Sequence, residues 1–380
     1  MSQMNWKVQL FELNYDETEV KAVEEVVRSG WLTMGMKTKS FEERFAALLG
    51  SGSQAIAVSS GTAALHMALL ALGVGPGDEV VVPALTFIAD ANVVRMVGAR
   101  PVLADCTSFD DWNIDPADVE RKITPKTRAV IIVHYAGYPC DMDALSAVCA
   151  PRKVAVVEDS AHAIDATYKG RQCGTFGEVG CFSFFANKNL SVGEGGMFAT
   201  RSEELAQQGR YLRSHGMSTL TLDRHQGRAI SYDVLAPGLN YRIDEFRAAL
   251  GLVQLDRLKK ANRARKEINR HYHELLAGLD GVSVPFQGLG DVEPSYHIFP
   301  ILLGQKVDRT RTIHAMRDRG IQTSIHYPAI QQFAAYKSLA LGATPIANAI
   351  SERELTLPMF PTMSTEQVEL VVRSLREALA

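Results

Sequence analysis

The chain has 380 residues and a mass of 41.6 kDa, which is long enough for two domains and a deep active site. Its hydrophobic fraction of 46% and charged fraction of 22% are globular averages, which argues against a disordered, collagenous or repeat protein. Forty Lys and Arg against 43 Asp and Glu give a net charge of −3, without the basic excess that nucleic-acid binding requires.

The five cysteines form no C-x-x-C pair, and their odd number cannot all close internal disulfides. A reducing cytoplasm fits this cysteine usage best. The N-terminal segment lacks the basic and apolar regions of a secretory signal, and no stretch of roughly 18 apolar residues runs without a charge. We therefore expect a soluble cytoplasmic protein with no membrane partner.

The first half of the chain alternates predicted helices with short apolar strands. Asp16 is a typical N-cap for a helix over 17–29 that ends at Gly30, and the same pattern predicts helices over 39–49 and 62–72. The β-rich apolar runs stand at 54–58, 79–82, 101–104, 128–133 and 154–158. Because these strands are apolar on both faces, we predict an α/β fold with a mostly parallel sheet covered by helices on both sides.

The composition changes from Gly174 onward, where aromatic and small residues alternate and predict strands joined by tight loops. A long helix is predicted over about 244–263, and the hinge between two domains is placed there. The last helix begins after Ser364, which opens a capping box. We predict a large α/β domain with an N-terminal arm over 1–250 and a smaller C-terminal α+β domain over 251–380.

Several strong catalytic motifs are absent from the sequence. It has no G-x-x-x-x-G-K-[ST] phosphate loop, no H-E-x-x-H zinc helix and no G-x-S-x-G nucleophile elbow. The glycine-rich stretch 73–78 follows a predicted helix and precedes a strand, which is the reverse of a dinucleotide-binding loop, and we interpret it as a turn. No bound metal is expected.

The stretch Ser59-Ser60-Gly61-Thr62 lies where a predicted strand ends and a helix begins. Free backbone N–H groups and the positive end of the helix dipole converge at such a place, which makes it an anion-binding site. An ordinary Ser/Thr helix cap, worth about 1 kcal/mol, is the alternative interpretation. The segment by itself does not decide between the two.

Two carboxylates and an imidazole follow the apolar strand at 154–158, in the order Glu158-Asp159-Ser160-Ala161-His162. The carboxyl edge of an open α/β sheet is where its ligands bind, so this position indicates a functional site. The alternative is that these acids are solvated loop residues leaving the strand.

Lys188 stands among aromatic and small residues, in Phe184-Phe185-Ala186-Asn187-Lys188-Asn189. A lysine becomes a nucleophile when burial and nearby cations lower its pKa, and its usual task is a Schiff base with a carbonyl substrate or pyridoxal phosphate (PLP). A snorkelling surface lysine is the alternative. Together, a helix N-terminus for a phosphate, an acid at a strand end and this lysine are the set of groups that PLP requires.

In several segments the sequence resembles the DegT/DnrJ/EryC1/StrS family of sugar aminotransferases, over nearly the whole chain. The segments that carry the resemblance are SGTAAL at 60–65, PALTFIADAN at 83–92, VHYAGYPCDMD at 133–143, VVEDSAHA at 156–163, CFSFFANKNLSVGEGGM at 181–197, LRSHGM at 212–217, LNYRIDEFRAALGLVQL at 239–255 and IHYPAI at 325–330. The resemblance implies the aspartate-aminotransferase-like architecture, known as fold type I, with PLP as the cofactor.

The resemblance also implies roles for individual residues. Lys188 would form the Schiff base with the cofactor and then shuttle the proton between cofactor and substrate. Asp159 would pair with the pyridine nitrogen and keep it protonated, so that the ring accepts electrons. Phe87 would stack on the ring. The cofactor's phosphate would be held by Gly61, Thr62 and Ser183.

Two further cofactor contacts follow from the resemblance. Asn240 would reach the phosphate in the neighbouring subunit, so the active site should need a homodimer. His162 stands where many relatives carry Gln and is expected to contact the cofactor ring or its 3-hydroxyl. A subgroup of the family replaces the lysine by His and removes a sugar hydroxyl as a dehydratase, whereas the Lys188 of this chain favours transamination.

On the substrate side, the resemblance points to four residues of this chain. They are Arg213, His215, His326 and Tyr327. Arg213 and Arg242 are candidates for the amino donor's carboxylate, because a guanidinium binds a carboxylate through two hydrogen bonds. Each could instead form a structural ion pair.

We therefore predict a PLP-dependent aminotransferase that moves an amino group from L-glutamate to a keto-sugar, most naturally a nucleotide-linked keto-deoxysugar, in aminosugar or surface-polysaccharide biosynthesis. An aminotransferase for an 8-oxo Kdo-type sugar acid is the second interpretation. A regulatory protein that binds PLP without turnover is the third. The identity of the sugar should depend on loops such as 218–236 and 323–336.

Overall fold

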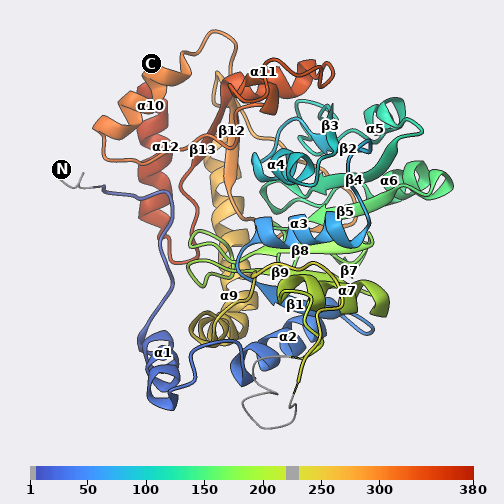
Figure 1. Cartoon of the computed structure of the whole chain (residues 1–380). Helices are drawn as coiled ribbons and strands as arrows, with labels where there is room; N and C mark the ends of the chain where they lie inside the picture. The colour runs from blue at the N-terminus through green and yellow to red at the C-terminus, as the bar shows by residue number, and fades with distance from the viewer. Residues whose placement is uncertain (1–5, 220–230) are drawn as a thin grey trace.

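The computed structural model describes residues 6–219 and 231–380. Its centre is a seven-stranded sheet with the strand order β1-β9-β8-β5-β4-β2-β3 (Figure 1). The strands from β8 to β3 run parallel, and β9 is antiparallel to both of its neighbours. In chain order the strands are β1 (Gln54–Val58), β2 (Glu79–Pro83), β3 (Arg100–Ala104), β4 (Thr127–Val133), β5 (Ala155–Asp159), β8 (Val179–Ser183) and β9 (Gly196–Thr200).

Helices cover both faces of this sheet, because side chains of both faces are apolar and alternate along each strand. In β2, Val80 and Val82 pack in one core, whereas Val81 packs in another. The first face carries α3 (Gly61–Ala71), α4 (Ala89–Met96) and α7 (Glu203–Arg213). The opposite face carries α2 (Met36–Leu49), α5 (Pro116–Lys122), α6 (Met142–Cys149) and the first part of α9 (Glu245–Leu276). The predicted α/β fold is confirmed.

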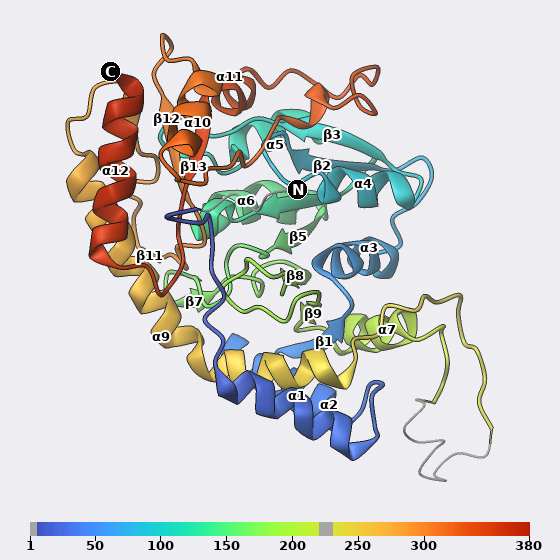
Figure 2. The same cartoon turned by 90° about the vertical axis from the view of Figure 1, so that its left-hand side faces the viewer.

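A second, three-stranded antiparallel sheet has the order β10-β12-β13. It packs in an apolar core with the last turns of α9, α10 and α12, and Figure 2 shows α9 and α12 side by side. The elements of this part are β10 (Val282–Ser283), β12 (Phe299–Leu303), α10 (Arg309–Asp318), α11 (Pro345–Arg353), β13 (Glu354–Leu357) and α12 (Thr365–Leu379). A small sheet, β11-β6-β7, joins β6 (Thr167–Tyr168) and β7 (Arg171–Gln172) to β11 (Val292–Glu293).

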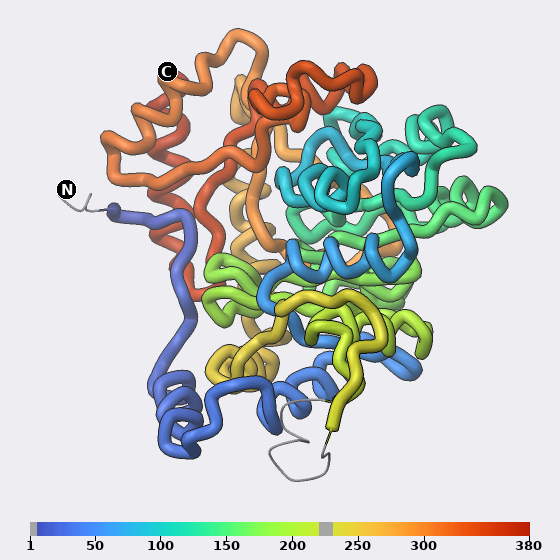
Figure 3. Tube along the Cα trace, in the orientation of Figure 1, coloured from blue at the N-terminus to red at the C-terminus, as the bar shows by residue number. Residues whose placement is uncertain are grey.

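Two features cross the predicted domain boundary at 250/251. This boundary lies inside α9, which continues 13 residues beyond the helix predicted over 244–263. The N-terminal arm, traced in Figure 3, packs on the C-terminal part of the chain, where Val8 bridges Ile321 and Leu10 accepts a hydrogen bond from Met359 N. The division into 1–250 and 251–380 therefore stays a prediction.

The local signals in the sequence place most element ends within a few residues. The helix α1 (Glu17–Ser29) begins at a capping box formed by Asp16 and Glu19, and α12 begins at one formed by Ser364 and Gln367. The predicted helix over 39–49 begins three residues earlier, at Met36. Within the described residues, no helix combines the length and the apolar character needed to cross a membrane.

The end of β5 is tied to the loop that precedes β8 by a buried carboxylate. Glu158 accepts hydrogen bonds from the backbone N–H groups of Gly174, Phe176 and Gly177 at 2.6, 2.6 and 2.7 Å. His134 Nε2 lies 3.1 Å from the same carboxylate, and both side chains are fully buried. Hydrogen bonds to a buried charged acceptor are strong, and donors left without a partner are costly.

We predict that Glu158→Gln lowers the free energy of unfolding by about 3 kcal/mol, because an amide offers one acceptor oxygen to several buried donors. Urea denaturation of the apoprotein measures this change. Glu43→Gln, on the exposed surface of α2, is the matched control and should change the stability by less than about 0.5 kcal/mol. Equal stabilities of the two variants would contradict the structural role of Glu158.

Candidate active site

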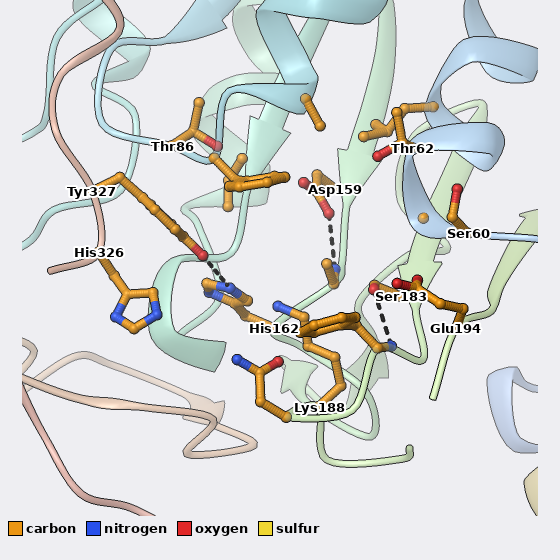
Figure 4. Close-up of a pocket in the computed structure, with 18 residues that line it drawn as sticks. Ser60, Thr62, Thr86, Asp159, His162, Ser183, Lys188, Glu194, His326 and Tyr327 are labelled. Atoms are coloured by element: carbon orange, nitrogen blue, oxygen red, sulfur yellow. Dashed lines mark hydrogen bonds between the residues drawn. The ribbon is translucent and has the colours of Figure 1, made fainter. Parts of the chain in front are cut away.

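A cavity of about 400 Å³ opens at the carboxyl ends of the central strands (Figure 4). It is lined from the start of α3, the loop after β2, the ends of β4, β5 and β8, the segment after β8, and the segment that contains His326 and Tyr327 between α10 and α11. Its lining includes most of the predicted site residues, namely Gly61, Thr62, Phe87, Asp159, His162, Ser183, Lys188, His326 and Tyr327.

The N-terminus of α3 forms one wall of the cavity. Ser60 is the N-cap, and its hydroxyl accepts a hydrogen bond from Ala63 N at 3.0 Å. A Cβ atom at Gly61 would lie 2.9 Å from Ser183 Cβ, so only glycine allows the helix to begin this close to the end of β8. First-turn N–H groups and the positive helix end therefore face the cavity beside the Thr62 and Ser183 hydroxyls, which is an arrangement suited to an anion.

The carboxylate of Asp159 enters the cavity from the end of β5. It accepts a hydrogen bond from Ala161 N at 2.9 Å and is 7% exposed. Burial raises the pKa of Asp159, and this rise is opposed by the Ala161 N–H and by the positive charge of Lys188. Asp159 is therefore a buried acid held in place next to a cation.

A second buried carboxyl group stands beside Asp159. Asp90, near the start of α4, is fully buried and accepts a hydrogen bond from the Thr86 hydroxyl at 2.6 Å. Burial and the charge of Asp159 raise the pKa of Asp90 well above its ordinary value. Two adjacent buried carboxylates do not both ionise, so Asp90 carries the proton and Asp159 carries the charge.

Lys188 approaches Asp159 from the segment after β8. Its backbone N–H donates to Phe185 O at 2.9 Å, which closes the turn that sends the side chain into the cavity. Burial lowers the pKa of Lys188 to about 8, while the carboxylate of Asp159 acts in the opposite direction. A lysine of this pKa is partly neutral near physiological pH and can act as a nucleophile or a base.

His162 and Tyr327 form a hydrogen-bonded pair on the opposite side of the cavity. His162 Nδ1 accepts from Ala136 N at 3.2 Å, so the proton of the neutral ring is on Nε2, which donates to the Tyr327 hydroxyl at 3.0 Å. Burial and the charge of Lys188 lower the pKa of His162 well below its ordinary value. The ring is therefore neutral, and the hydroxyl proton of Tyr327 is left for a bound molecule.

His326 is oriented from behind by β13. Its Nδ1 lies 2.9 Å from the Thr356 hydroxyl, which in turn donates to the buried Glu354, and His326 N donates to Glu354 Oε2 at 2.8 Å. The hydrogen bond at Nδ1 fixes the orientation of the ring. Burial and Lys188 lower the pKa of His326 to about 3, and burial raises the pKa of Glu354 to about 8.

The raised pKa of Glu354 predicts a pH dependence of stability. A carboxyl group whose pKa is about 8 in the folded chain and about 4.5 in the unfolded chain stabilises the fold below pH 4.5, and this contribution is lost as the pH rises through 8. The stability of Glu354→Gln relative to the native protein should therefore increase between pH 4.5 and 8. Urea denaturation across this range measures the difference, with the exposed Glu352→Gln as the control; a constant difference would contradict the prediction.

Arg213 is not among the residues that line the cavity, and its predicted contact with substrate stays a prediction. It is 3% exposed, forms an ion pair with Glu42 and donates to Ala57 O at 2.9 Å, so it ties α7 to α2 and β1. His215 and Asn240 also lie outside the cavity and are exposed. Asn240 bridges Ser214 in backbone pairing.

Two loops are expected to select the sugar, 218–236 and 323–336. Within 218–236, residues 220–230 lie outside the described part of the chain. The second loop, 323–336, brings His326 and Tyr327 to the cavity.

Sequence reasoning assigned no role to four residues that line or adjoin the cavity, Thr86, Asp90, Asn187 and Glu194. Asp90 lies within a segment that carried the family resemblance, but nothing in the residue pattern pairs it with Asp159, 69 positions away.

Comparison with known proteins agrees with this geometry. Residues 14–376 match the model of the DegT/DnrJ/EryC1/StrS aminotransferase family. The chain belongs to this family. It is 40% identical over 367 residues to the spore coat polysaccharide biosynthesis protein SpsC of Bacillus subtilis, with 94% of each chain covered. Family members are sugar aminotransferases that use PLP, so this chain is a PLP-dependent sugar aminotransferase.

Two solved structures are similar to the whole chain. The aminotransferase TlmJ from Streptoalloteichus hindustanus has a TM-score of 0.90 and 37% identity over 98% of both chains. The putative sugar aminotransferase Spr1654 from Streptococcus pneumoniae, in its PMP form, has a TM-score of 0.91 and 31% identity over 99% of both chains. The predicted fold type I architecture is confirmed by these similarities.

The cavity fits the cofactor of this family. PLP needs an anion site, an acid for its ring nitrogen and an amine for its aldehyde. The cavity supplies the N-terminus of α3, Asp159 and Lys188. The glycine at position 61, where a side chain would collide with Ser183, leaves room for a phosphate at the helix end.

Proposed function

We propose that this protein is a cytoplasmic homodimer that transfers an amino group from L-glutamate to a nucleotide-linked keto-deoxysugar, in aminosugar or surface-polysaccharide biosynthesis. The observation that carries the proposal is the convergence of Lys188, Asp159 and the N-terminus of α3 on one cavity. The similarity to SpsC supports the polysaccharide context, since its name places that relative in spore coat polysaccharide biosynthesis.

In this proposal PLP, when bound, supplies an electron sink that stabilises negative charge on the carbon that loses a proton. Lys188 would hold the cofactor covalently through Nζ, and its free amine would take and return the proton. Asp159 would keep the ring nitrogen protonated, which its own charge favours. The start of α3 and Ser183 would hold the phosphate. Phe87, which is 54% exposed at the cavity, would stack on the ring.

The opposite side of the cavity presents polar groups of defined direction to the sugar. The Tyr327 hydroxyl donates, because His162 Nε2–H already occupies its acceptor side. His326, whose ring is held by the hydrogen bond between Nδ1 and Thr356, offers Nε2 as the second polar group. A hydroxylated keto-sugar offers both donors and acceptors, so these two groups can fix its orientation.

The proposed dimer is supported by the need for a cationic group that binds the carboxylate of the amino donor. Among the cavity-lining residues in the described ranges, Lys188 is the only Lys or Arg. Carboxylates are bound best by an Arg that donates two hydrogen bonds. We propose that the segment with the exposed Asn240 and the half-buried Arg242 completes the site of a second subunit, Asn240 at the phosphate and Arg242 at the carboxylate.

The first test compares the absorption spectra of the native protein and Lys188→Ala with PLP, before and after L-glutamate. We expect a bound-cofactor band in the native protein that glutamate converts to the amine form, and neither feature in the variant. The exposed Lys306→Ala is the matched control and should behave as the native protein. A native spectrum that glutamate leaves unchanged would contradict the donor assignment, and a normal response of Lys188→Ala would contradict the role of Lys188.

We predict that Asp159→Asn retains covalent attachment of PLP but loses at least roughly 10²-fold in the rate of the glutamate half-reaction, because the ring nitrogen loses its charged partner. Stopped-flow absorption under single-turnover conditions measures the rate. Asp165→Asn, on the loop after His162, is the control carboxylate and should change the rate less than about threefold. A native-like rate in Asp159→Asn would contradict the assignment.

Acceptor assays separate the remaining alternatives. The aminated native enzyme is mixed with a nucleotide-linked keto-deoxysugar and, separately, with an 8-oxo Kdo-type sugar acid, and regeneration of PLP absorbance is followed. Faster regeneration by the nucleotide-linked sugar supports the proposal, whereas a preference for the sugar acid favours the second interpretation. Catalytic turnover with either acceptor excludes a purely regulatory PLP-binding protein.

A further inference from the structure

His297 approaches Lys188 from the side of the chain that carries the second sheet. Its Nε2 lies 3.4 Å from Lys188 Nζ, and its side chain is buried. The backbone of His297 is fixed on both sides, because its N–H donates to Ala136 O at 2.9 Å and its carbonyl accepts from Arg265 at 3.0 Å. The imidazole is therefore a rigid neighbour of the lysine.

The hydrogen bonds behind the ring determine where its proton is. Asn189 Nδ2 donates to Asn262 Oδ1 at 2.8 Å and to Ser295 O at 2.7 Å, which turns Asn189 Oδ1 toward His297. His297 Nδ1 lies 2.9 Å from that oxygen and must donate to it. The neutral ring then has no proton on Nε2, and this nitrogen presents its lone pair to Lys188.

The charges around the ring keep it neutral. Burial is the largest cause that lowers the pKa of His297 well below its ordinary value, followed by the positive charges that face it. Lys188 and Arg265 carry these charges, whereas the neighbouring rings of His162 and His326 are themselves neutral. On the lysine side, the carboxylate of Asp159 faces the amine. A neutral imidazole between these groups acts as a hydrogen-bond acceptor and not as a further cation.

We propose that His297 is a positioning residue for Lys188, whose amine donates one N–H to His297 Nε2 whenever it is not bound to the cofactor. A neutral amine has two N–H groups and one lone pair. Giving an N–H to His297 leaves the lone pair to face away from the imidazole and into the cavity, where the proton is taken. This inference rests on the proposed role of Lys188.

The test uses the apoprotein and the variants His297→Phe and His297→Gln. Phenylalanine keeps the ring's volume without an acceptor, and glutamine offers an amide oxygen in its place. With ¹³C-labelled lysine, NMR follows the titration of Lys188, assigned by its loss in Lys188→Met. We expect His297→Phe to titrate at lower pH than the native protein, because the ammonium form loses an acceptor, and His297→Gln to titrate closer to it.

The rate at which the apoprotein captures PLP covalently is the second readout. At a pH above the titration of Lys188, where the amine is neutral in every variant, we expect His297→Phe to be slower by about tenfold, the size expected for one hydrogen bond to an amine, and His297→Gln to recover most of the rate. The exposed His314→Phe is the matched control and should leave both readouts unchanged. If His297→Phe lowers only the melting temperature, the residue is a packing residue and the proposal is wrong.

A measurement on the native apoprotein covers the case in which the variants do not fold. ¹⁵N NMR of labelled histidine reports which ring nitrogen carries the proton, and a proton on His297 Nε2 would overturn the proposal. An unprotonated Nε2 supports it. Because the titration and the ¹⁵N spectrum need no cofactor, they stand apart from the absorption test of PLP binding, in which failure would overturn the proposed function instead.

Discussion

The structure depends on the alternation of side chains at the end of β5. Glu158 and Asp159 are consecutive, so they point to opposite sides of the strand. Glu158 accepts three backbone N–H groups of the loop before β8 and thereby fixes where β8 begins. Asp159 enters the cavity on the other side. Glu158 therefore holds the scaffold and Asp159 serves the chemistry, and a shift of the strand register by one residue would turn each side chain to the wrong face.

The electrostatics of the cavity follow from burial combined with fixed hydrogen bonds. Three imidazoles, those of His162, His297 and His326, surround Lys188, and burial keeps each of them neutral. For His162 and His297, backbone and side-chain partners determine which nitrogen donates and which accepts. The buried charges are those of Lys188 and Asp159, and the exposed side chain of Glu194 also lines the cavity. A bound molecule thus meets one buried charged pair beside three neutral imidazoles.

Local signals in the sequence were sufficient for much of the fold and for the centre of the site. The caps at Asp16 and Ser364 mark helix starts, and strand-end positions locate Asp159, because these signals need only neighbouring residues. The ion pair of Arg213 could not be predicted, since its partner Glu42 is 171 positions away and no residue pattern reveals such a pair. The motif around Lys188 was informative because the family resemblance covers it.

The length of α9 and the role of His297 were missed for a related reason. Beyond residue 263, α9 buries Arg265 and Asn269, and polar side chains at core positions interrupt the apolar pattern that indicates a helix. Arg265 donates to the carbonyls of His297 and Met359, and Asn269 donates to Tyr138. These contacts join segments that are distant in sequence, so only the folded chain brings them together.

The 32-residue helix α9 has a further consequence for how the molecule unfolds. Its first half packs with Phe41 and Phe45 under the large sheet, and its second half packs with Phe299 under the small one. Melting either half would expose an apolar stripe of the same continuous helix. The two sheets therefore share one cooperative unit, and a chain cut within α9 would leave both fragments without a complete core.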